Sequence, residues 1–130
     1  MASIFTKIIR GEIPCYKVAE TEDCIAFLDI LPLAKGHVLV IPKKEVNNYF
    51  DLDEELFHKV NSLSKKISHA IKKVVPCERI GVSVIGLEVP HAHVHLVPIN
   101  SISDLDFTKD RVKLSSEEFK ELADEISANL

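Results

Sequence analysis

The sequence has little of what stabilises extracellular domains or anchors a chain in a membrane. It contains three cysteines, an odd number, and none belongs to a Cys-x-x-Cys pair. This argues against a disulfide framework and favours a reducing compartment. No apolar run approaches the ~18 residues of a membrane span, and the N-terminal segment lacks the apolar stretch of a signal peptide. We therefore expect a cytoplasmic protein with no membrane partner.

A stripe of basic residues is also absent. The chain carries 16 basic and 20 acidic side chains, and the net charge of −4 comes entirely from residues 101–130. Nucleic-acid binding requires clustered positive charge, so we expect no nucleic-acid partner. With 46% hydrophobic and 28% charged residues, the 130-residue chain has the composition of a globular protein. We expect one domain over residues 1–130, which needs no disulfide or structural metal.

Hydrophobic periodicity predicts two helices. Apolar residues recur at steps of three and four from Leu52 to Val74, which is typical of a long amphipathic helix. Asp51 and Glu54 offer a capping box at its start. A second box at Ser115 and its partner three residues later predicts a helix over 116–127, within an acidic C-terminal extension at 101–130.

Five short segments rich in Val and Ile, bounded by Pro, Gly or Asp, predict strands. These segments are 15–20, 23–29, 37–41, 79–85 and 91–97. The strands come in runs and do not alternate with helices, which favours an α+β fold with an antiparallel sheet.

Histidine is in excess, with six in the chain, and three of the six alternate with apolar residues. A period of two is typical of a strand, so His91, His93 and His95 should project from one face. Pro90 and Pro98 flank this row. Three imidazoles are therefore expected side by side on one surface.

The residues alone leave four interpretations of this row open. It could be a wet strand face, although Thr, Lys or Glu would serve there equally well. It could bind zinc with His37 or Cys77, although side chains ~6.7 Å apart along a strand do not converge on a point. It could be a pH-sensing interface. It could also be catalytic, because near pH 7 one imidazole can act as a nucleophile while another donates a proton, as nucleotidyl transfer requires.

The run from His91 to Val97 resembles the signature of the histidine-triad (HIT) nucleotide-binding proteins. Segments 4–14, 26–30 and 36–43 also resemble segments of that family, in the family's order. The resemblance covers about residues 3–100 and is closest to the Hint-like branch. It implies the HIT fold, a five-stranded antiparallel sheet with a long central helix, and a two-fold homodimer.

The resemblance also implies roles for individual residues. His93 would be the nucleophile. His91 and His95 would orient its ring and contact phosphate oxygens or the leaving group, and His37 matches a fourth active-site histidine. Asp29 would accept hydrogen bonds from the ribose hydroxyls. The slot around the base would be lined by Phe5, Ile8, Ile13, Phe27 and Ile30, which without the resemblance would be interpreted as ordinary core residues.

The function implied is hydrolysis or transfer at the α-phosphorus of a small purine nucleotide. Nucleoside phosphoramidates or related nucleotide conjugates would be cleaved to a nucleoside monophosphate through a nucleotidyl-histidine, without a cofactor. Three alternatives remain open: a non-catalytic module that binds a purine nucleotide or a partner, a dinucleoside polyphosphate hydrolase, and a metal hydrolase.

The chain departs from the family pattern just before the row of histidines. Many relatives have Gly-Gln-Ser or Gly-Gln-Thr there, whose polar side chains contact phosphate, whereas this chain has Gly86, Leu87 and Glu88. By strand parity Leu87 shares the face of the histidines, and Glu88 lies on the opposite face and points away from them. We then expect a tighter and less polar phosphate pocket.

A second departure concerns zinc. Some bacterial relatives bind it at positions that correspond here to Ser3, Thr6 and Glu45. Because Ser and Thr are poor zinc ligands, we expect no metal. The remaining histidines, His58 and His69, are expected to be surface residues of the long helix.

Overall fold

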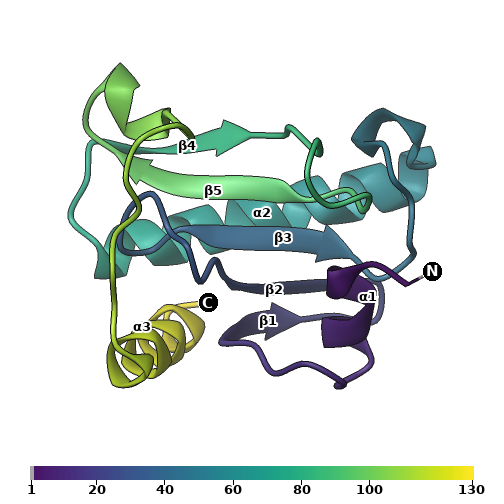
Figure 1. Cartoon of the computed structure of the whole chain (residues 1–130), viewed down its shortest axis with the longest axis horizontal. Coiled ribbons are helices and arrows are strands. Elements are labelled where there is room, and N and C mark those ends of the chain that lie inside the picture. The colour runs from purple at the N-terminus through teal and green to yellow at the C-terminus, as the bar shows by residue number, and fades with distance from the viewer. Residues whose placement is uncertain (1) are drawn as a thin grey trace.

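A five-stranded antiparallel sheet lies at the centre of the computed structural model, which describes residues 2–130 (Figure 1). The strand order is β1-β2-β3-β5-β4, and every neighbouring pair is antiparallel. The strands are β1 (Lys17–Glu20), β2 (Cys24–Leu28), β3 (Val38–Pro42), β4 (Arg79–Ser83) and β5 (Val94–Ile99). The α+β class and the five-stranded antiparallel sheet expected from the sequence are confirmed.

Helix α2 (Glu54–Val74) packs on one face of this sheet (Figure 1). Three residues of its apolar stripe, Val60, Ile67 and Ile71, are fully buried in one core cluster with strand residues such as Val40. Helix α3 (Ser116–Ala128) packs beside β1 and against α2. Within residues 2–130, no helix combines the length and the apolar character needed to cross a membrane.

The helix starts follow local capping chemistry. Ser115 and Glu118 form the predicted capping box of α3. The box predicted at Asp51 is wrong, because Asp51 ends a 3-10 turn (Tyr49–Asp51) before α2 begins. Asp53 caps α2 instead, where its Oδ1 atom accepts a hydrogen bond from the Leu56 amide at 2.8 Å.

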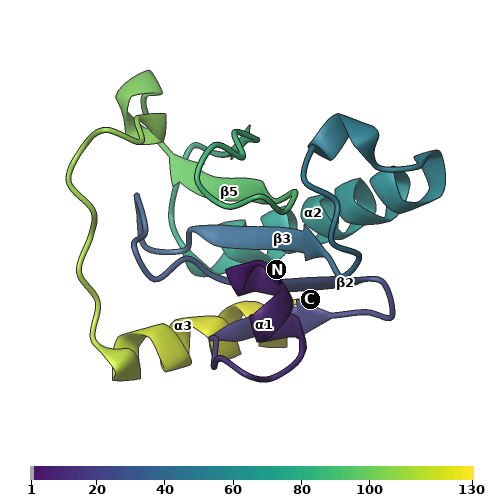
Figure 2. The same cartoon turned by 45° about the vertical axis from the view of Figure 1, so that its right-hand side comes forward.

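The short helix α1 (Ile4–Ile9) lies over the opposite face of the sheet (Figure 2). Successive strand residues point to opposite faces, so Val40 of β3 packs in the core under α2. Its neighbour Leu39 joins Phe5 of α1 and Phe27 of β2 in a second, smaller apolar cluster. Leu39 pairs with His95 on β5, so the site described below opens on the face that α2 leaves uncovered.

The strand expected over 91–97 begins later than predicted. Residues 84–93 form a loop, and β5 starts at Val94. The His91 amide turns back to the Val89 carbonyl at 2.8 Å, and the Ala92 amide donates to the Val46 carbonyl at 2.7 Å. Because Pro90 cannot donate to a ladder, this stretch is held by loop contacts and the strict alternation of a strand does not apply before Val94.

Candidate active site

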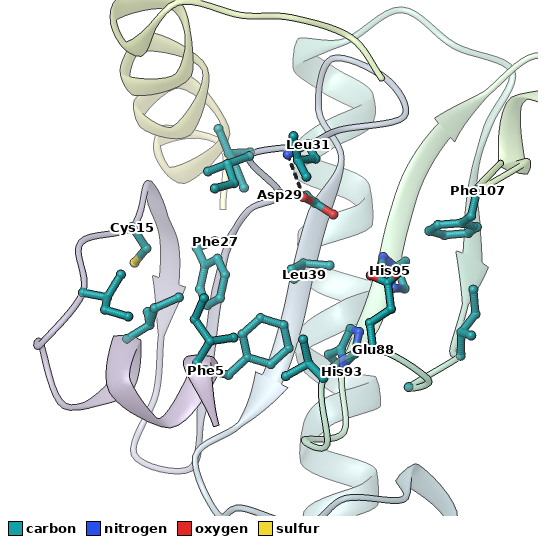
Figure 3. Close-up of a pocket in the computed structure, with 18 of the residues that line it drawn as sticks. Phe5, Cys15, Phe27, Asp29, Leu31, Leu39, Glu88, His93, His95 and Phe107 are labelled. Carbon is teal, nitrogen blue, oxygen red and sulfur yellow. Dashed lines mark hydrogen bonds between the residues drawn. The ribbon is translucent and has the colours of Figure 1, made fainter. Parts of the chain in front are cut away.

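A pocket of about 410 Å³ opens on the sheet face that carries α1. Figure 3 shows Phe5 and Phe27 on one side of it, His95 and Phe107 on the other, and Asp29 between them. The residues predicted to bind nucleotide all line it: Phe5, Ile8, Ile13, Phe27, Asp29 and Ile30. His93 and His95 line it too, whereas His91 and His37 are buried behind them.

The ring of His93 is held by the backbone of the residue two before it. Its Nδ1 atom lies 2.7 Å from the His91 carbonyl oxygen. A carbonyl only accepts, so Nδ1 carries the hydrogen and the lone pair of the neutral ring is on Nε2. Burial lowers the pKa of His93, which favours that neutral form. The ring is therefore oriented as a nitrogen nucleophile.

His91 is fully buried and fixed at both ring nitrogens. Its Nε2 atom donates to the Pro42 carbonyl at 2.8 Å, so Nδ1 of the neutral ring is the acceptor and takes a hydrogen bond from the Ser3 hydroxyl at 2.8 Å. Ser3 also caps α1, because its Oγ atom accepts from the Thr6 amide at 3.0 Å. His91 thus positions α1 as well as the His93 ring.

Glu45, an exposed residue, bonds to this cluster from its outer side. Its Oε1 atom accepts from the Ser3 amide and from the Thr6 hydroxyl, both at 2.6 Å, and these bonds lower the pKa of Glu45 to about 2. Ser3, Thr6 and Glu45 are the positions where some relatives bind zinc. Here two of the three side chains are hydroxyls already engaged in hydrogen bonds, so this set of donors does not suit zinc.

His37 and His95 form a hydrogen-bonded pair. The Leu33 amide donates to His37 Nδ1 at 3.0 Å, so the hydrogen of the neutral ring is on Nε2, which lies 2.9 Å from His95 Nδ1. Because His95 Nδ1 accepts this hydrogen bond, the hydrogen of the neutral His95 ring is on its Nε2 atom. Burial, with the positive charge of neighbouring groups, lowers the pKa of His95 to about 4 and that of His37 to about 3. Both rings are neutral near pH 7.

The free ring nitrogens open into the pocket. Within residues 2–130, every fully buried side-chain nitrogen or oxygen has a hydrogen-bond partner. The Nε2 atoms of His93 and His95 have no hydrogen-bond partner among the residues that the structure describes, and their rings lie 5.0 Å apart between centroids. A lone pair and an N–H donor are therefore presented side by side to a ligand.

Asp29 lies between the apolar and imidazole sides of the pocket (Figure 3). Its Oδ1 atom accepts from the Leu31 amide at 2.9 Å, and Oδ2 lies 3.5 Å from His37 Nε2. Burial raises the pKa of this carboxyl. Asp29, His37 and His95 place possible ligand atoms within 4.8 Å of one another, but the hydrogen bond between the two imidazoles already uses the nitrogens that would bind a metal.

The structure corrects the prediction that Glu88 points away. Glu88 lines the pocket, where its negative charge adds to the rise that burial causes in the pKa of Asp29 and offsets a part of the lowering that burial causes in the pKa of His93. Strand parity fails because this stretch is a loop, in which Gly86 has a φ of 71°. Leu87 is 89% exposed at the rim. The pocket is thus more strongly charged near His93 than expected.

Phe107 and Arg111 also line the pocket, and neither was among the predicted site residues. Phe107 lies 4.7 Å from the His95 ring between centroids, and Arg111 lies over Phe107 at 5.6 Å. Both belong to the C-terminal segment that the sequence analysis treated as an acidic extension. The available signal was weak: an aromatic residue and an arginine four positions apart in a polar stretch.

Comparison with known proteins gives one consistent family. The HIT domain model matches residues 10–102. An uncharacterized HIT-like protein of Borreliella burgdorferi is 38% identical, and the match covers 98% of this chain and 97% of that protein. Adenosine 5'-monophosphoramidase hnt1 of Schizosaccharomyces pombe is 38% identical, and the match covers 100% of this chain and 99% of that protein. The crystal structure of a HIT-like protein from Bartonella henselae has a TM-score of 0.85 and 37% identity, over 98% and 96%.

Proposed function

Because the chain belongs to the HIT family, we propose that it is a nucleotide hydrolase that cleaves nucleoside phosphoramidates through His93. The observation that carries the proposal is the hydrogen bond from His93 Nδ1 to the His91 carbonyl, which leaves Nε2 as a free nucleophile in the pocket. The S. pombe relative, identical at 38% of positions, is named an adenosine 5'-monophosphoramidase. Phosphoramidates are therefore the first substrates to test.

The shape of the pocket supports one orientation of the substrate. A purine base would lie against the apolar side of the pocket formed by Phe5 and Phe27, whose rings pack edge to face with their centroids 5.9 Å apart. Asp29 would accept hydrogen bonds from the ribose hydroxyls at the middle of the pocket. The α-phosphate would then reach His93, and the leaving group would point toward His95.

The reaction would take two displacements at the α-phosphorus. In the first, His93 Nε2 forms a bond to phosphorus and the P–N bond to the leaving group breaks. The leaving nitrogen accepts a hydrogen bond from His95 Nε2 and takes up one proton from solvent, so that it departs as an amine. In the second, water forms a bond to phosphorus, the bond from phosphorus to His93 Nε2 breaks, and one proton of that water passes to solvent. His37 keeps His95 in the tautomer that donates.

Replacement of His93 by Ala tests the proposal. With an adenosine phosphoramidate as substrate, the release of the monophosphate should fall by about a thousandfold or more, since the nucleophile is lost. His69→Ala, at an exposed position of α2, is the matched control and should keep full turnover. Undiminished release by the His93 variant would refute the proposed function.

Glu88 favours a second candidate, a nucleotide-binding protein without turnover. Its carboxylate lies at the pocket where many relatives carry a polar residue that contacts phosphate, and it would repel that phosphate. This candidate predicts that AMP raises the melting temperature while neither a phosphoramidate nor a dinucleoside polyphosphate is cleaved. Cleavage of the polyphosphate alone would instead indicate the dinucleoside polyphosphate hydrolase.

A further inference from the structure

The C-terminal segment past the matched HIT region closes one end of the pocket. Arg111 Nη1 donates to the Leu31 carbonyl at 2.7 Å, and Nη2 donates to the Phe107 carbonyl at 3.2 Å. The Val112 amide donates to the Pro32 carbonyl at 2.9 Å. These bonds fasten the segment to the loop that follows Asp29, so Phe107 and Arg111 are held in place beside the site.

Arg111 brings a positive charge to this end without a partner of opposite sign. Within residues 2–130, no carboxylate lies within ion-pair distance of its guanidinium, and the side chain is only partly exposed. Two of its N–H groups are used by carbonyls, and others of the five remain available. A planar guanidinium with free donors is suited to a carboxylate or a phosphate.

Arg111 lies at the end of the pocket where His95 is, and not at the end where His93 is. Phe107 connects the two, since its ring contacts the His95 ring and carries the Arg111 guanidinium on its face. The charge of Arg111 adds to burial in lowering the pKa of His95 and of His37 and opposes the rise that burial causes in the pKa of Asp29, whereas the pKa of His93 is lowered chiefly by burial. Phe5, at the opposite end, lies 4.9 Å from the His93 ring.

We propose that Arg111, supported by Phe107, binds an anionic group on the leaving group and so selects nucleotide conjugates whose leaving group carries a carboxylate or a phosphate. The inference rests on the proposed function, which places the leaving group toward His95. Arg111 would also supply a hydrogen-bond donor for an anion, which neither Leu87 nor Glu88 can supply.

The test compares two adenosine phosphoramidates that differ only at the leaving amine. One releases an amino acid with a free carboxylate, and the other releases the corresponding neutral amide. For Arg111→Gln, the ratio of kcat/KM for the acid to kcat/KM for the amide should fall by about 10- to 100-fold, as expected for one lost charge-assisted hydrogen bond. Arg111→Lys keeps the charge but not the fork, and should recover part of this ratio.

Lys113→Gln, at an exposed position of the same segment, is the matched control for loss of a positive charge and should leave the ratio unchanged. A dinucleoside polyphosphate, whose leaving group is a nucleoside polyphosphate, distinguishes a phosphate from a carboxylate: the substrate whose kcat/KM falls more with Arg111→Gln carries the preferred anion. An equal fall for acid and amide would overturn the inference and indicate that Arg111 only holds the Leu31 loop. Failure of the wild-type protein to cleave any conjugate would overturn the proposed function as well.

Discussion

Single hydrogen bonds to the backbone decide which nitrogen of each active-site imidazole faces the ligand. The His91 carbonyl makes His93 a nucleophile, and the Leu33 amide, acting through His37, makes His95 a donor. The row of histidines predicted these residues, but a sequence does not specify a tautomer. Leu33 has no polar side chain, so its contribution could come only from the folded backbone.

Asp29 provides a test at the level of one residue. Asp29→Asn should weaken the binding of AMP by about 1.5 to 3 kcal/mol, the usual effect of losing a hydrogen bond to a charged acceptor. The 2′,3′-dideoxy analogue, which lacks the hydroxyls, should bind both proteins equally. Calorimetry measures both affinities, and Asp110→Asn at an exposed position is the control. Equal weakening of AMP and its analogue would contradict ribose binding by Asp29.

The element that depends most on distant parts of the chain is α1. It is too short for its period to stand out in the sequence, and the sequence analysis did not predict it. Ser3, Glu45 and His91 fix it by hydrogen bonds, and these residues come close only when β3 and β5 pair. The α2 and α3 helices, by contrast, follow from local periodicity, and the Ser115 box was predicted correctly.

Two N-cap serines, Ser3 and Ser115, allow the effect of a helix cap on stability to be distinguished from the effect of positioning His91 on activity. Ser3→Ala and Ser115→Ala should each lower the free energy of unfolding by about 1 kcal/mol, because each removes a helix cap. Only Ser3→Ala also removes the donor to His91 Nδ1, so its kcat/KM should fall by about tenfold while that of Ser115→Ala is retained. Urea unfolding and phosphoramidate turnover measure the two effects. Equal activities in the two variants would refute a role of Ser3 beyond capping.

For the whole molecule, the order of strands and helices in the sequence predicted the fold class, while the pocket depended on its irregular parts. Glu88 lies in a loop, and the alternation of side chains along a strand therefore predicted the wrong direction for its side chain. Phe107 and Arg111 lie in a segment with no motif. Such positions are fixed by long-range contacts, for example from Arg111 to the Leu31 carbonyl, which hydrophobic periodicity does not encode.

The buried imidazoles predict how stability depends on pH. In the unfolded chain His37 and His95 take up protons near their usual pKa of 6.5, whereas in the folded protein their pKa values are about 3 and about 4. The unfolded state therefore binds more protons below pH 6.5, and the free energy of unfolding should fall by about 3 kcal/mol between pH 6.5 and 5. Urea unfolding at several pH values measures it. If the free energy of unfolding of His95→Asn falls as steeply with pH as that of the wild-type protein, the buried imidazoles are not the cause.

The homodimer implied by the family resemblance remains a prediction. Strand β4 is an edge of the sheet, paired only with β5, and Val82 on it is 61% exposed. Pairing of two β4 edges would satisfy the free backbone groups around a two-fold axis. Sedimentation should then show a dimer, and Val82→Lys should yield monomers while Phe50→Lys, at another exposed apolar site, does not. A wild-type monomer at micromolar concentration would contradict the prediction.

The central claim is that His93 forms a covalent bond to the nucleotide, and rapid-quench mass spectrometry during turnover of an adenosine phosphoramidate tests it most directly. The peptide that contains His93 should gain the mass of an adenylyl group, at a rate no slower than the release of the monophosphate. The adduct should be absent from His93→Gly. Release of the monophosphate without any adduct, or an adduct on another residue, would contradict the account.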